Sequence, residues 1–103
     1  MMTVDANVWV AAYDPHDRFH RDSVAFLSAV LERRIPLVAP AIMPLEAACA
    51  LARRAGQSEV GAVAFERLQN APGLRLLPLD GKLLSVATQL GTQALLRGAD
   101  ALY

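Results

Sequence analysis

Three carboxylates differ from the other acidic residues of the chain in their surroundings. Asp5 interrupts an apolar run, Glu46 lies early in an apolar helical pattern, and Asp100 lies close to the start of another. If folding brought them together, they would repel one another unless protons, cationic partners or bound metal compensated. Oxygen ligands favour Mg²⁺ or Mn²⁺. Such a site suits phosphodiester hydrolysis, since the metal offsets phosphate charge and lowers the pKa of the attacking water.

Each of these acids also has an ordinary structural interpretation. Glu46 and Asp100 could be first-turn acids that the helix dipole stabilises. Asp5 is harder to explain in this way, because an unpaired carboxylate within an apolar strand is costly to bury. Backbone N–H groups that satisfy a buried Asp5 are the alternative to a functional site.

The elements that must position these acids alternate between strands and helices. Apolar runs predict strands at the start of residues 3–13, at 35–40 and at 74–79. The first predicted helix has Pro15 at its first position and runs to about Arg34, and the second covers residues 43–55 with Gly56 as its C-cap. A third runs from a capping Ser58 to about residue 70, and a fourth from the capping Asp80 to Gly91. A fifth begins at about Gly98. This pattern predicts an α/β fold with a parallel sheet whose first strand, carrying Asp5 and Asn7, is central.

Composition limits the function further. The 103 residues make one domain, and ten Lys and Arg balance ten Asp and Glu, which argues against a polycationic nucleic-acid sleeve or a basic membrane-surface helix. We find no signal peptide and no apolar run of bilayer length, so we expect a cytoplasmic protein without membrane contact. The single cysteine, Cys49, lies in an alanine-rich run and is expected to be a small buried hydrophobe.

The motifs around these residues resemble the PIN-domain family, and within it the VapC-type toxins of bacterial toxin–antitoxin pairs. The resemblance rests on Val4-Asp5-Ala6-Asn7-Val8, Pro44-Leu45-Glu46 on a helix that ends in Arg53-Arg54, and Gly98-Ala99-Asp100-Ala101, in this order over the whole chain. It implies a PIN-like three-layer α/β/α domain over residues 1–103. It also implies an endoribonuclease that uses Mg²⁺ or Mn²⁺ to hydrolyse RNA with a metal-activated water.

The resemblance further implies a role for individual residues. Asp5, Glu46 and Asp100 match the catalytic metal ligands, and Asn7 matches the small polar residue that helps to hold the site. The implied partners are RNA, a cognate antitoxin and a second copy of the chain in a homodimer.

The chain departs from the family pattern at its C-terminal end. PIN domains continue past the helix of the third acid into a strand with a fourth acid, so the last strand and helix are expected to be missing here. The first strand would then become an open edge. The competing hypothesis is therefore a non-catalytic, truncated PIN-like binding or scaffold module. A nucleotide-binding α/β domain is excluded, because no glycine-rich loop follows the first strand.

Cationic and aromatic side chains offer contacts for RNA or a partner. Arg53 and Arg54 could contact RNA phosphates or an antitoxin carboxylate, or interact with their helix C-terminus instead. Trp9 and Phe19 could stack on a base, or fill the core or a dimer interface.

Overall fold

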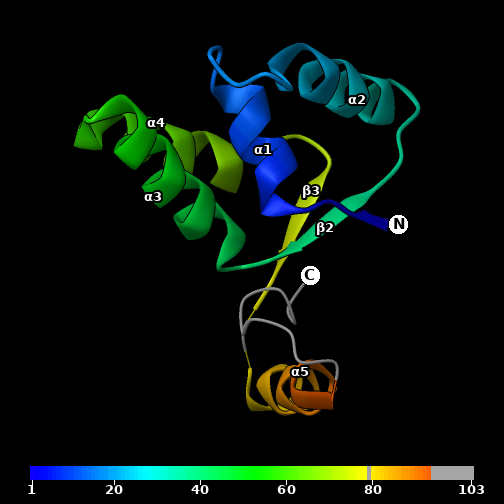
Figure 1. The fold of residues 1–103 in the computed structure, drawn as a ribbon. Helices are drawn as coiled ribbons and strands as arrows, with labels where there is room; N and C mark the ends of the chain where they lie inside the picture. Colours follow the sequence, from blue (N-terminus) through cyan, green and yellow to red (C-terminus); the bar gives the residue numbers. More distant parts are fainter. Residues whose placement is uncertain (79, 94–103) are drawn as a thin grey trace.

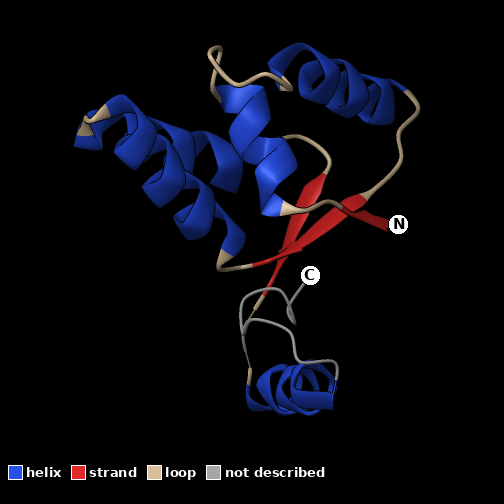
Figure 2. Cartoon of the chain, viewed as in Figure 1, coloured by secondary structure: helices blue, strands red, loops and turns tan. Residues whose placement is uncertain are grey.

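The computed structural model of the chain describes residues 1–78 and 80–93. Its elements are β1 (Met2–Thr3), α1 (Ala6–Tyr13), α2 (His20–Glu32), β2 (Leu37–Pro40), α3 (Met43–Ala55), α4 (Ser58–Gln69), β3 (Leu74–Leu77) and α5 (Gly81–Gln93). Figure 2 shows these short strands alternating with longer helices. The chain is therefore an α/β protein, as the alternation predicted. The helix expected from Gly98 lies outside the described residues.

The three strands form a parallel sheet in the order β1-β2-β3. Met2 pairs with Leu37, and Leu37 pairs with Leu74 on its other side. All four residues of β2 are buried, whereas β1 and β3 each leave residues exposed. Within the described sheet β2 is therefore the central strand. β1 therefore lies at an edge of the described sheet, which differs from the central position predicted for the first strand and agrees with the open edge expected if the last strand is missing.

The segment that carries Asp5 and Asn7 is a helix rather than a strand. β1 ends at Thr3, and α1 begins at Ala6 with Asp5 as its N-cap. The sequence prediction failed because α1 is apolar around most of its circumference, and a short apolar run looks the same for a buried helix and a buried strand. Trp9 and Val10 of α1 are both buried in the core.

Residues 14–19 form a turn, so the helix predicted from Pro15 begins only at His20. The turn is stable because two aspartates accept backbone hydrogen bonds two residues ahead. Asp14 Oδ1 accepts from His16 N at 3.0 Å, and Asp17 Oδ1 accepts from Phe19 N at 2.8 Å. The His20 ring then donates from Nδ1 to the Ala11 carbonyl at 2.8 Å, which joins α2 to α1.

Helices α3 and α4 form a hairpin around Gly56. The boundaries of α3 agree with the prediction, and Gly56 ends it in the left-handed conformation with φ 66°. Gln57 rather than Ser58 is the N-cap of α4, and no side chain caps that helix. Gly61 lets the two helices approach closely, because a methyl group there would lie 2.7 Å from the Ala48 carbonyl oxygen.

One core joins the first four helices to the sheet. It consists mainly of apolar residues from α1, α2, β2, α3 and α4, of which Met43 and Leu68 are fully buried. Figure 1 shows these helices grouped together, whereas α5 lies beyond the end of β3, away from the group. None of the helices in the described ranges is long and apolar enough to cross a membrane.

Cys49 is exposed, so the prediction of a buried cysteine was wrong. On α3 the neighbouring Ala47 and Ala48 face the core, and Cys49 falls on the other side of the helix. An alanine-rich run does not show which of its positions is buried, because alanine is compatible with both environments.

Candidate functional site

Asp5 lies two residues after the end of β1, at the carboxyl end of the sheet. Its Oδ1 accepts a hydrogen bond from Asn7 N at 3.1 Å, and its carbonyl oxygen accepts from Val8 N at 3.0 Å. These bonds satisfy N–H groups in the first turn of α1. The Asp5 side chain is exposed rather than buried, so it is a capping carboxylate that also faces solvent.

Glu46 follows the neighbouring strand at the same edge of the sheet. β2 runs parallel to β1 and ends at Pro40, and Glu46 lies in the first turn of α3. Helices α1 and α3 pack against each other. Asp5 and the half-buried Glu46 therefore lie at the starts of two helices that pack against each other and that both begin at the carboxyl end of the sheet.

The third predicted ligand, Asp100, lies outside the described residues. Within residues 1–78 and 80–93, no three His, Cys, Asp or Glu side chains are grouped so that they could hold a metal ion. Asp80 also follows a strand of the sheet, and its carbonyl oxygen accepts from Leu84 N at 3.0 Å. That bond places Asp80 at the N-cap position of α5, as the sequence predicted.

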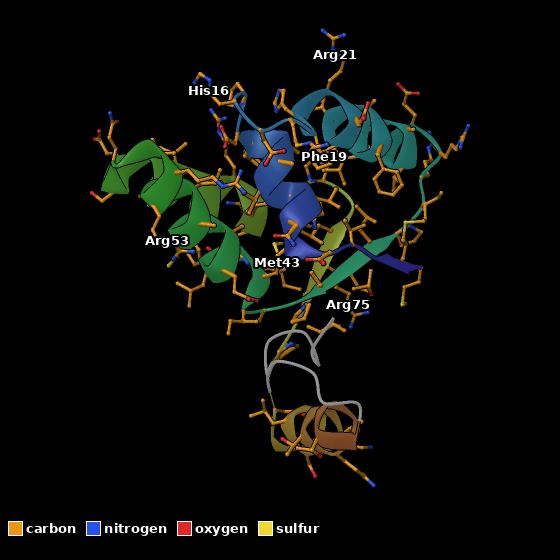
Figure 3. The ribbon with its side chains drawn as sticks, in the orientation of Figure 1. His16, Phe19, Arg21, Met43, Arg53 and Arg75 are labelled. Atoms are coloured by element: carbon orange, nitrogen blue, oxygen red, sulfur yellow. The ribbon has the colours of Figure 1, made fainter. Side chains whose placement is uncertain are left out.

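Asn7 lines a groove on the side of α1 that faces α2. This α1–α2 groove has a volume of about 710 Å³ and is bounded mainly by Asn7, Val8, Arg18, Phe19, Phe26 and Arg54. Figure 3 shows Phe19 beside α1, where the chain enters α2. The groove is larger than two other hollows in the described part of the chain, which have volumes of about 220 and 490 Å³.

Arg54 contributes to one wall of this groove through a pair of salt bridges. Its Nη1 lies 2.6 Å from Asp17 Oδ2 and 3.0 Å from Asp14 Oδ2. The guanidinium thus connects the last turn of α3 to the turn before α2, across 37 and 40 residues of sequence. We refer to these three residues as the Arg54 clamp.

The clamp changes the acidity of its members. The hydrogen bond from Arg54 holds the pKa of Asp14 and of Asp17 below the ordinary value of 3.8, and the backbone bonds in the turn act in the same direction. Hydrogen bonding to Asp17 and then to Asp14 raises the pKa of Arg54. The Arg54 side chain is 46% exposed, so water and salt screen these interactions.

The two arginines predicted as RNA or partner contacts have different surroundings. Arg54 bonds to carboxylates of its own chain, whereas Arg53 is exposed on the side of α3 away from α1 (Figure 3). The two aromatic side chains predicted as base contacts also differ in exposure, because Trp9 is buried and Phe19 is 54% exposed. Trp9 fills the core, and Phe19 alone of the two is accessible to a base.

The groove and the clamp were not found from the sequence. Asp14-Pro15 and Asp17 are typical of a turn, and that signal is correct. No local pattern indicates which distant cation pairs with these aspartates. Comparison of the chain with protein-family models, with curated proteins and with solved structures gives no match in any of the three.

Proposed function

We propose that the chain is a metal-dependent endoribonuclease with a PIN-like three-layer fold, and that it is the toxin component of a toxin–antitoxin pair. The observation that carries this proposal is the position of Asp5 and Glu46 at the starts of two packed helices, after adjacent parallel strands. Ligand and catalytic sites of open parallel sheets lie beyond this edge.

The donor chemistry of these residues fits a hard divalent cation. Two carboxylates supply only oxygen, the ligand that Mg²⁺ and Mn²⁺ prefer. Asp5 and Glu46, with Asp100, would hold the ion, and the ion would offset phosphate charge and make water more acidic. The backbone N–H of Asn7 holds Asp5 Oδ1 at 3.1 Å, and the supporting role of the Asn7 side chain is proposed from the PIN resemblance.

The PIN resemblance is also the basis for proposing the partners, which are RNA as substrate, a cognate antitoxin and a second copy of the chain. An antitoxin cation placed beside Asp5 and Glu46 would compensate the same negative charge as the metal and would block the site.

The test is a calorimetric titration of the 103-residue chain with Mn²⁺, followed by RNA cleavage assays. Asp5→Asn keeps an oxygen that can cap α1 but removes the charge, so loss of binding is not loss of folding. Glu46→Gln has a matched control in Glu59→Gln, since Glu59 is the exposed first-turn acid of α4.

We expect Asp5→Asn and Glu46→Gln each to weaken Mn²⁺ binding at least about tenfold and to abolish cleavage, and Glu59→Gln to change neither. If the folded wild-type chain binds no Mn²⁺, or if Glu46→Gln binds it as tightly as Glu59→Gln, the nuclease site is refuted. The scaffold hypothesis would then take its place.

A further inference from the structure

We propose that the α1–α2 groove is a base-binding subsite in which Phe19 stacks on one base of a single-stranded RNA. The inference rests on the proposed function, because it supplies the contact that holds the substrate beside Asp5. Neither the groove nor this role for Phe19 follows from the acidic residues themselves.

Aromatic exposure is the first observation in favour of this subsite. The chain has three phenylalanines, and two of them, Phe19 and Phe26, line the groove while being 54% and 42% exposed. Phenylalanine is usually buried, and folding gains little from a ring left in water. An exposed aromatic surface inside a hollow of about 710 Å³ has the size and character of a ligand site.

The position of the groove is the second observation. Asn7 lines it, and Asn7 is bonded through its backbone to the Asp5 carboxylate. The groove therefore begins next to the acid proposed to act on the RNA phosphate. In the proposed complex, an RNA strand with a phosphate near Asp5 continues along the groove, and one of its bases stacks on Phe19 between α1 and α2 (Figure 3).

The charges around Phe19 suit a nucleotide better than a purely apolar ligand. The Arg18 guanidinium lies over the Phe19 ring, 4.7 Å from its centroid, so a cation accompanies the aromatic surface. Base stacking on aromatic rings with adjacent arginines is the common way in which proteins bind single strands. Arg54 is shared between Asp17 and Asp14, so it compensates only part of the Asp17 charge on the groove wall.

Asp22 is the acid on the groove wall that opposes this ligand. It is exposed and lies in the first turn of α2. Arg18 and Asp22 both line the groove, so a phosphate bound there is subject to both charges. Neutralising Asp22 should therefore strengthen RNA binding, and this direction is opposite to the one expected for removal of the aromatic ring.

The test compares Phe19→Leu with Phe19→Tyr in the full chain. Leucine keeps most of the apolar surface but cannot stack, whereas tyrosine keeps the ring. Binding of a fluorescently labelled, unstructured oligoribonucleotide is measured by anisotropy at fixed salt in the presence of EDTA, so that neither metal binding nor cleavage enters the result. Val63→Ala is the control, since Val63 is 48% exposed on α4 and does not line the groove.

We expect Phe19→Leu to bind the RNA at least about tenfold more weakly than the wild type, and Phe19→Tyr and Val63→Ala to bind it as the wild type does. Asp22→Asn should bind more tightly. Circular dichroism confirms that each variant is folded, which the exposure of Phe19 leads us to expect.

Two results would overturn the subsite. The first is that the folded wild type does not bind the RNA. The second is that Phe19→Leu binds the RNA as tightly as Phe19→Tyr, which is expected if the groove holds an apolar segment of a partner protein. The cleavage assay with Mn²⁺ separates this failure from failure of the proposed function. Cleavage with unaltered binding by Phe19→Leu refutes the subsite alone, and ring-dependent binding without cleavage refutes the nuclease alone.

Discussion

Replacing Gly61 by alanine tests the packing of α3 against α4, the hairpin that carries both Glu46 and Arg54. A methyl group at Gly61 would lie 2.7 Å from the Ala48 carbonyl oxygen and 3.0 Å from Ala52 Cβ. The oxygen belongs to the backbone of α3 and cannot rotate away. The two helices must therefore separate by several tenths of an ångström if Gly61→Ala is to fold.

Two effects of opposite sign decide the result. Alanine is favoured over glycine inside a helix by about 1 kcal/mol. Overpacking of a well-packed contact costs about 1–3 kcal/mol, and a backbone contact this short belongs in the upper part of that range. We therefore expect Gly61→Ala to lower the free energy of unfolding by about 1–2 kcal/mol.

The neighbouring residue provides the control. Ala62 is exposed on the same helix, so Ala62→Gly measures the helix propensity alone and should cost about 1 kcal/mol. Urea unfolding followed by far-ultraviolet circular dichroism gives both values, provided that the dependence on urea is the same for all three proteins. If Gly61→Ala is as stable as the wild type or more stable, the close approach of α3 and α4 is wrong.

Three further predictions concern the Arg54 clamp and two helix ends. Arg54→Met should lower the melting temperature slightly at neutral pH, as expected for an exposed ion pair. Since the folded pKa values of Asp14 and Asp17 lie below 3.8, this difference should persist above that pH and disappear as the pH falls through the lowered values, which thermal unfolding at a series of pH values will show. Gly56→Ala should lower the free energy of unfolding in urea by about 1 kcal/mol, because Gly56 has a φ of 66°, and Gly56→Asn should lower it less. If Gly56→Ala is as stable as the wild type, the left-handed cap is wrong. Asp5→Ala should lower the free energy of unfolding by about 1 kcal/mol, because the cap bond from Asn7 N is lost, whereas Asp5→Asn should lower it by only a few tenths of a kcal/mol. An equal loss in both variants would mean that the charge of Asp5, and not its cap bond, stabilises α1.

Local signals in the sequence were sufficient for several elements. The apolar periodicity over 43–55 and the glycine that follows it predicted α3 and its C-cap at the observed residues. The proline-bracketed apolar run at 35–40 predicted β2, and Asp80 predicted the start of α5. In each case the determinant lies within one or two helical turns of the residue concerned, so no tertiary information is needed.

Only the tertiary structure decided where the functional candidates lie. Asp5 caps a helix because α1 is enclosed by α2 and α3, and an apolar run does not specify whether such a buried segment is a helix or a strand. Burial of Trp9 and exposure of Phe19 likewise depend on which faces meet other helices.

The Arg54 clamp and the α1–α2 groove join residues that are far apart in sequence. The amino-acid sequence by itself determined the α/β alternation and the identity of the acids. The positions of Asp5 and Glu46 at the same end of the sheet, and the groove along α1, depend on parallel strand pairing and helix packing, which are non-local interactions that periodicity does not encode.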